Sequence, residues 1–217
     1  MKKAGEVKAK NSFPTEIRVV AEELSVAVRQ DHDASTVTFL SLSKSLLQIL
    51  DKIGPTMAVL RQDVHKNIER LEKIYLLDPS LYSCVGEILK KEVDDGTARK
   101  RESCAKAVLW LTRSMNFSLA LIKNIEKDSE WNLEQIVEES YKSTLKPWHG
   151  WISSAAYKVA LKLLPEKEVF SSLLMSKGQN CNILKVDIQK FVSLLRPFID
   201  EINAILRKLR LDRMKST

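Results

Sequence analysis

The sequence predicts an all-α protein that folds as a single domain of about eight helices. Three observations support this prediction. Apolar residues recur at the three- and four-residue spacing of amphipathic helices along most of the chain, and no segment reads as a convincing strand. Glycine and proline number six each, which is few for an all-β chain with many turns. The length of 217 residues is enough for one substantial core.

Turn signals separate the helices of the first half. Asp31-His32-Asp33 ends the first apolar stripe, Gly54-Pro55 follows the second, and Asp78-Pro79 starts the next turn. The expected helices cover residues 16–30, 35–53, 56–75 and 81–93.

The second half follows the same logic. A loop over residues 94–97 precedes a long helix with one apolar stripe. Pro147 and Pro165 mark the ends of the next two helices, and Pro197 is a candidate kink in the last one. The expected helices cover residues 98–125, 131–145, 150–164, 166–175 and 183–211.

The chain is expected to comprise a disordered basic tail over residues 1–14, the folded domain over residues 15–212 and a second tail over residues 213–217. No apolar h-region follows the lysine-rich N-terminus, and no run reaches the ~18 apolar residues of a membrane span. The three cysteines, Cys84, Cys104 and Cys181, form no close pair and suit free thiols in a reducing compartment. These features predict a cytosolic protein with peripheral membrane contact.

Composition narrows the function classes. The formal net charge of +7 suits an anionic membrane surface or nucleic acid, so the sign alone leaves both open. No nucleic-acid motif is present, so nucleic acid is not an expected partner. The scattered glycines form no phosphate loop, and the three histidines lack metal-ligand spacing. We therefore expect no enzyme, cofactor or metal.

Three short stretches combine polar and aromatic side chains over residues 63–70, 110–113 and 146–151. Within the first, Asp63, Asn67 and Arg70 are spaced at i, i+4 and i+7, which places them on one helix face. Their carboxylate, amide and guanidinium could bind a polyhydroxylated ligand, and no nucleophile accompanies them. The alternative is a solvated helix face, because charged faces are common.

The aromatic residues also have two interpretations. Trp110 is either part of the core or a stacking surface. His149 is a structural histidine, a ligand-binding group or half of a nucleophile dyad with Cys104 or Cys181, although no catalytic motif surrounds either cysteine. Trp148 and Trp151, beside Lys146, form either an interfacial anchor or a packed helix start.

Together these motifs resemble the glycolipid transfer protein family, which comprises soluble all-helical carriers of sphingolipids. Several of these sequence segments are most similar to plant members of the family. The resemblance implies a two-layer helical sandwich, lipid binding without catalysis, and a match over roughly residues 35 to 200. The matching motifs are Asp63-x3-Asn67-x2-Arg70-Leu71-Glu72-Lys73-Ile74-Tyr75, Trp110-Leu111-Thr112-Arg113, Trp148-His149-Gly150-Trp151 and Ser176-Lys177-Gly178-Gln179-Asn180.

The resemblance also implies residue roles. Asp63, Asn67 and a lysine, here replaced by Arg70, hold the sugar headgroup in the family, and the aspartate also takes the ceramide amide N–H. Trp110 matches the floor on which the first sugar stacks. His149 matches the residue that hydrogen-bonds the ceramide amide carbonyl.

Further positions match the hydrocarbon tunnel and the membrane contact. Phe117, Leu145 and Tyr157 match tunnel residues. Trp151 matches the membrane-contacting tryptophan, and Trp148 is a second candidate. Family members often close the pocket with a tyrosine-containing apolar tail, whereas residues 207–217 here are basic and lack tyrosine.

The ligand expected from this resemblance is a glycosphingolipid, with glucosylceramide or another simple glycosylceramide favoured. Relatives that carry ceramide-1-phosphate have cations at the positions of Lys106, Trp110 and Asn67, and only Lys106 is a cation here. Lys106 is thus a candidate headgroup contact, and a ceramide-1-phosphate carrier is the alternative. An alternative from another class is a helical interaction or nucleic-acid-binding module. We expect a monomer that contacts membranes transiently.

Overall fold

The computed structural model describes residues 16–30, 34–54, 57–127, 130–174 and 181–216. Within these ranges it contains nine helices and no strand, which confirms the all-α prediction. The expectations for residues 1–14, 31–33 and 176–180 lie outside the described residues. The helices are α1 (Glu16–Gln30), α2 (Thr36–Ile53), α3 (Ala58–Leu77), α4 (Val85–Asp94), α5 (Cys104–Lys127), α6 (Leu133–Thr144), α7 (Trp151–Leu161), α8 (Lys167–Leu174) and α9 (Cys181–Lys208).

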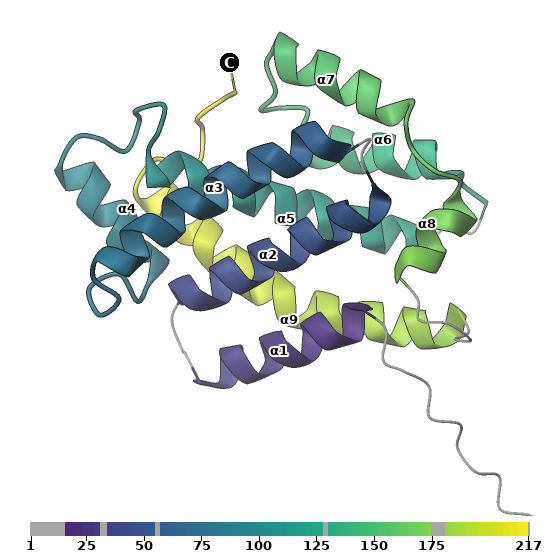
Figure 1. The fold of residues 1–217 in the computed structure, drawn as a ribbon, viewed down its shortest axis with the longest axis horizontal. Coiled ribbons are helices and arrows are strands. Elements are labelled where there is room, and N and C mark those ends of the chain that lie inside the picture. The colour runs from purple at the N-terminus through teal and green to yellow at the C-terminus, as the bar shows by residue number, and fades with distance from the viewer. Residues whose placement is uncertain (1–15, 31–33, 55–56, 128–129, 175–180, 217) are drawn as a thin grey trace, which may run out of the picture.

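The helices form two packed layers, as the resemblance implied (Figure 1). Helices α1, α2 and α3 make one layer, and α5, α6 and α9 make the other. The layers meet where α1 packs on α9 and α3 packs on α5. Helix α4 covers one end, α7 lies beside α6, and α8 packs against α2. The division of the chain into a domain and two tails stays a prediction.

Helix α5 is the centre of the core. Its predicted apolar stripe is buried throughout. Helix α5 packs against α6 and α9 in its own layer and against α3 in the other layer. The buried stripe consists of Val108, Leu111, Met115, Leu119 and Ile122. Polar residues such as Thr112 are buried on the same helix, where the hydroxyl donates to the carbonyl of Val108 at 2.7 Å.

The start of α5 differs from the sequence expectation. Helical periodicity placed it after residue 97, whereas the helix begins at Cys104. The carboxylate of Glu92 accepts hydrogen bonds from the backbone N–H groups of Cys104 and Ala105, both at 2.7 Å. A side chain from α4 therefore satisfies the free donors of the first turn, and this fixes the helix start. Residues 97–103 form turns that carry several charged side chains.

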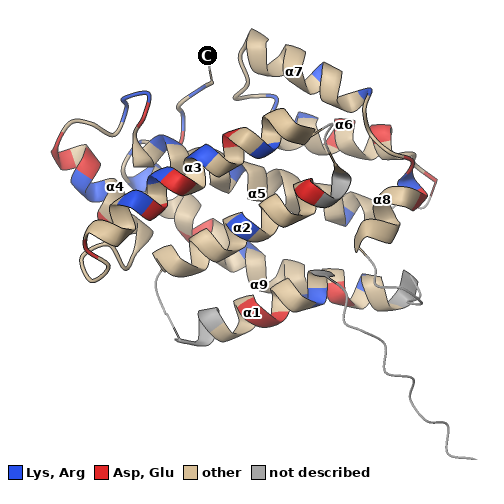
Figure 2. Ribbon diagram, in the orientation of Figure 1, with Lys and Arg blue, Asp and Glu red and all other residues tan. Residues whose placement is uncertain are grey.

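Charge is unevenly distributed over the helices (Figure 2). Helices α3 and α4 carry many charged residues of both signs, whereas Lys158 is the only charged residue of α7. In the part of the chain that the structure describes, none of the helices combines the length and the hydropathy that a bilayer crossing requires. Pro197 lies inside α9, and the helix continues through it.

Candidate functional site

The predicted polar row on α3 is present. Val64 and Ile68 pack in the core, and the adjacent face of the helix carries Asp63, Asn67 and Arg70, of which Asn67 is itself buried. The Asn67 amide donates to the Asp63 carbonyl at 3.0 Å and to its Oδ2 at 3.4 Å. Nη1 of Arg70 donates to Oδ1 of Asn67 at 3.3 Å. The three side chains therefore form one connected row with donors and acceptors on adjacent turns.

Both ends of this row have a particular electrostatic setting. Arg70 pairs with the carboxylate of Glu102, a residue in the α4–α5 connection that sequence reasoning missed. At the other end, partial burial raises the pKa of Asp63, and the positive charges of Arg70 and Lys66 oppose this effect. The Asp63 carboxylate is thus an incompletely solvated acceptor, which favours a donor from a ligand.

The aromatic residues of the site meet between α5 and the turn before α7. Trp110 is half-buried on α5, and its ring centroid lies 5.6 Å from that of His149, with the planes tilted by 41°. Because α3 packs against α5, the Trp110–His149 pair and the polar row belong to neighbouring elements. The structure thus combines a hydrogen-bonding row with an aromatic surface, as the sequence suggested.

His149 is oriented by a residue that sequence reasoning missed. The Tyr141 hydroxyl lies 3.2 Å from Nδ1 of His149, and the two ring centroids are 5.4 Å apart. Burial and the charge of Arg113 both lower the pKa of His149, so the imidazole is neutral at pH 7. In the tautomer in which Nδ1 accepts from the phenol, the ring carries its proton on Nε2. His149 can then donate one hydrogen bond to a ligand carbonyl.

Arg113 is a second residue whose position the sequence did not reveal. It is only 6% exposed, and its guanidinium carbon lies 4.7 Å from the ring centroid of Trp110 and 4.2 Å from that of Trp148. Burial lowers the pKa of Arg113 to about 10, partly opposed by Asp212, so it stays charged at pH 7. An arginine three residues after Trp110, within the motif of residues 110–113, was the signal that could have found it.

The C-terminal segment contacts the site, although the sequence gave no support for such a contact. Arg113 donates from Nη1 to the Met214 carbonyl at 2.7 Å and from Nη2 to the Asp212 carbonyl at 2.8 Å. The Ser216 N–H donates to the Trp148 carbonyl at 3.0 Å. The basic C-terminal segment therefore contacts the site through the carbonyls of Asp212 and Met214 and the N–H of Ser216.

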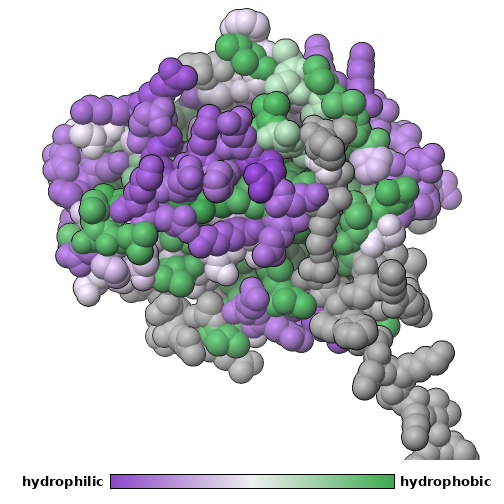
Figure 3. Space-filling view, viewed as in Figure 1, coloured by the Kyte–Doolittle hydropathy of each residue, from purple (hydrophilic) through white to green (hydrophobic). Residues whose placement is uncertain are grey.

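The two tryptophans near His149 have different environments. Trp148 is half-buried against Arg113, whereas Trp151 is 80% exposed at the first position of α7. Ile152 and Val159 on the same helix are also exposed. Figure 3 shows apolar side chains gathered at the top of the molecule, where Figure 1 places α7. Trp151 is thus open to solvent, whereas Trp148 packs against Arg113. The membrane contact of either tryptophan stays a prediction.

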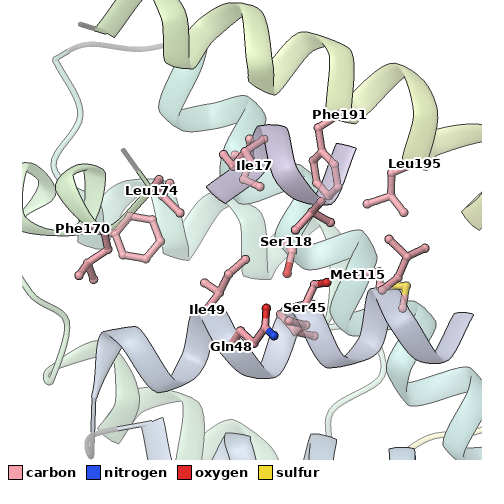
Figure 4. A pocket seen from close by; sticks show the side chains of 15 residues that line it. Ile17, Ser45, Gln48, Ile49, Met115, Ser118, Phe170, Leu174, Phe191 and Leu195 are labelled. Atoms are coloured by element: carbon pink, nitrogen blue, oxygen red, sulfur yellow. The ribbon is translucent and has the colours of Figure 1, made fainter. Parts of the chain in front are cut away.

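An apolar cavity of about 60 Å³ lies between the two layers (Figure 4). Helices α1, α2, α5, α8 and α9 contribute its walls. Its lining includes Ile17, Leu46, Met115, Phe170, Leu174 and Phe191. A volume of this size holds only a few water molecules, so a hydrocarbon chain requires the helices to move apart.

The residues predicted to line a tunnel do not belong to this cavity. Phe117 and Tyr157 are half-buried and pack against the core, and Leu145 caps α6. Tyr157 stacks on Tyr141 with centroids 3.5 Å apart, and burial raises the pKa of Tyr157 to about 12. Their role as tunnel residues stays a prediction.

The remaining candidates are the two cysteines that could pair with His149 as nucleophiles, a metal site, and the cation Lys106. Burial, with the charge of Glu92, raises the pKa of Cys104 to about 12, so this residue is a thiol at neutral pH and not a thiolate. The side chain of Cys181 lies outside the described residues. Among the described residues, no group of three or more His, Cys, Asp or Glu side chains could hold a metal ion. Lys106 is half-buried in the first turn of α5, one turn before Trp110.

Sequence comparison identifies relatives along nearly the whole chain. A sequence model described as glycolipid transfer protein (GLTP) matches residues 34–176. Glycolipid transfer protein 3 of Arabidopsis thaliana is 45% identical over 215 residues, covering 93% of this chain and 92% of that protein. Glycolipid transfer protein 1 of the same plant is 34% identical over 182 residues, covering 84% and 88%.

Solved structures share the fold at low sequence identity. A structure of FAPP2, described as selecting simple glycosphingolipids using the GLTP-fold, matches with a TM-score of 0.77 and 22% identity, covering 84% of this chain and 90% of its own. Human ceramide-1-phosphate transfer protein in complex with 12:0 ceramide-1-phosphate matches with a TM-score of 0.80 and 16% identity, covering 91% and 98%.

Proposed function

The chain belongs to the glycolipid transfer protein family, and on this premise we propose that it carries a glycosphingolipid between membranes, favouring glucosylceramide or another simple glycosylceramide. The observation that carries the proposal is the hydrogen-bonded row Asp63–Asn67–Arg70 on a helix packed against the one that bears Trp110. The proposed carrier is a cytosolic monomer that needs no cofactor or metal, contacts membranes transiently and does not bind nucleic acid.

The site can satisfy both ends of a ceramide amide. The Asp63 carboxylate is an acceptor for the amide N–H, and the Nε2–H of His149 is a donor for the amide carbonyl. Leaving either amide group unpaired in a buried site would cost ~1–3 kcal/mol. Because the pair of residues matches the pair of amide groups, lipids without this amide are expected to bind more weakly.

The remaining residues suit a sugar. The indole face of Trp110 can stack on the apolar C–H face of a pyranose. Asn67 can then donate to and accept from the sugar hydroxyl groups along the α3 row, and Arg70 can donate to them. A headgroup that lacks these hydroxyls would leave buried polar groups without partners, and this difference selects the ligand.

The apolar interior provides a place for the hydrocarbon chains. Each buried methylene is worth ~0.8 kcal/mol, so two long chains hold a sphingolipid in a bilayer by well over ~15 kcal/mol. Extraction therefore requires an equally dry cavity. The small cavity between the layers supports this step, because helices can separate there without breaking backbone hydrogen bonds within any helix.

A ceramide-1-phosphate carrier is the second candidate. Lys106 near Trp110 favours it, and so does the fold shared with the ceramide-1-phosphate transfer protein. Two observations favour a neutral sugar instead. Arg70 is already paired with Glu102, and the Asp63 carboxylate would repel a phosphate.

Transfer between vesicles tests the proposal. Labelled glucosylceramide, galactosylceramide and ceramide-1-phosphate would be compared in parallel, with the Asp63→Val and Trp110→Ala variants beside the wild type. We expect fast transfer of a glycosylceramide that both variants lose. Preferred transfer of the phosphate lipid would overturn the headgroup assignment. A folded protein that transfers none of the three lipids would show that only the fold is shared.

A further inference from the structure

Ser216 holds the backbone on both sides of His149. Its N–H donates to the Trp148 carbonyl at 3.0 Å, and its hydroxyl oxygen accepts from the Gly150 N–H at 2.9 Å. The hydroxyl also lies 3.0 Å from that of Ser153 in the first turn of α7. One residue near the end of the chain thus fixes the main chain of the predicted amide-binding histidine.

Arg113 binds the same C-terminal segment that contains Ser216. Its planar guanidinium uses two different nitrogens for two carbonyls, those of Asp212 and Met214. The faces of the guanidinium contact the indoles of Trp110 and Trp148. A buried cation is costly to desolvate, and here two carbonyls and two aromatic rings compensate it.

We propose that Arg113 and residues 211–216, together termed the C-terminal clasp, position Trp110 and His149 and thereby set headgroup selectivity. The proposal rests on the proposed function for the nature of the ligand. Arg113 and Ser216 act as positioning residues, because they contact the two binding residues or their backbone and not the headgroup surface itself. Trp110 is held by the guanidinium, and His149 is held through Trp148 and Gly150.

The geometry explains why arginine and not lysine occupies position 113. An ammonium is a single point donor, whereas the guanidinium fork reaches two carbonyls and stacks on two rings with one rigid plane. An Arg113→Lys variant keeps the charge and much of the length but cannot make all four contacts. A purely electrostatic role would therefore tolerate this change, and a positioning role would not.

Arg99 provides a matched control. Its Nη2 donates to the Arg210 carbonyl at 2.8 Å, so it also anchors the chain just before the C-terminal clasp. No aromatic contact is recorded for Arg99 among the described residues. An Arg99→Met variant removes a comparable side-chain-to-carbonyl bond while leaving the aromatic surface in place.

The test compares selectivity and not affinity alone. The Kd values for glucosylceramide and for ceramide with identical hydrocarbon chains would be measured for the wild type and for Arg113→Lys, Ser216→Ala and Arg99→Met. The ratio of the two Kd values cancels any change in the tunnel or in overall stability. We expect Arg113→Lys to reduce this selectivity ratio about tenfold, equivalent to about 1.4 kcal/mol. Ser216→Ala acts on His149, whose amide contact both lipids share, so it should raise both Kd values and change their ratio less. Arg99→Met should leave both Kd values unchanged.

A second readout needs no lipid. The indole N–H resonances of Trp110 and Trp148 and the backbone N–H of Gly150 would be followed in the ligand-free protein. Arg113→Lys should shift both indole signals, Ser216→Ala should shift the Gly150 signal, and Arg99→Met should move none of them. Unshifted signals, or Kd values that rise equally for both lipids in Arg113→Lys, would overturn the proposal. A wild type that does not discriminate glucosylceramide from ceramide, with shifted signals in the variants, would instead contradict the proposed function.

Discussion

Replacing Trp151 by alanine is expected to weaken membrane binding without changing the stability of the fold. The side chain is 80% exposed, so its removal leaves no cavity in the core. Exposed substitutions of this kind typically change the free energy of unfolding by no more than about 0.5 kcal/mol. The effect on membrane binding should be much larger, because most of the apolar area of the indole is exposed and can enter a membrane.

The magnitude follows from the exposed area. A tryptophan side chain offers about 150–250 Å², so an 80% exposed one presents about 120–200 Å² to a membrane. At about 25 cal/mol per Å², complete insertion is worth about 3–5 kcal/mol. Insertion to half that depth, at the headgroup level, gives about 1.5–2.5 kcal/mol and a loss of about 10- to 60-fold in vesicle binding.

Trp131 is the matched control. It is 37% exposed and lies just before α6, away from α7 in the chain. Vesicle binding by co-sedimentation, transfer rates and thermal unfolding would be compared for Trp151→Ala, Trp131→Ala and the wild type. Equal losses in both variants, or unchanged binding in Trp151→Ala, would refute the assignment of α7 as the membrane contact.

Three further predictions concern the site. Asp63→Asn should leave the melting temperature unchanged or raise it, because it removes a partly desolvated charge, and it should reduce glycosylceramide transfer at least about tenfold. A large fall in melting temperature would contradict this reasoning. Tyr141→Phe should remove the hydrogen bond at Nδ1 of His149, so the imidazole should lose its preference for the tautomer protonated at Nε2, and transfer should slow. ¹⁵N NMR of the imidazole detects this change, and an unchanged tautomer would show that Tyr141 does not set it. His149 has a lowered pKa in the folded state, so falling pH protonates the unfolded chain first, at its ordinary pKa of about 6.5. The free energy of unfolding should fall below that pH and level off below the folded pKa, and His149→Asn should flatten this part of the pH profile.

Local sequence pattern determined the helices and one face of the site. The buried face of α5 could be predicted without knowing its neighbours, because an apolar stripe with a 3.6-residue period is buried whichever helices pack against it. The same periodicity placed Asp63, Asn67 and Arg70 together. Motif resemblance then identified Trp110 and His149 as residues worth connecting to that face.

The local sequence pattern could not predict a helix end that is capped by a side chain distant in the sequence. Periodicity alone could not place the start of α5, because the group that fixes it is the Glu92 carboxylate on another helix. The same limitation applies to Glu102, whose pairing with Arg70 changes the net charge at the headgroup row. Neither acidic residue differs in sequence context from the solvated ones around it.

The sequence by itself determined the fold class, the periodic faces of the helices and the chemical types available at the site. Only the tertiary structure decided that the Arg113 guanidinium lies over the rings of Trp110 and Trp148, that Tyr141 contacts His149, and that Ser216 holds the backbone beside it. The physical reason is the range of the interactions. A helix face depends on residues three or four apart, whereas Arg113 and the Met214 carbonyl are 101 positions apart and meet only because α5 and α9 pack against each other.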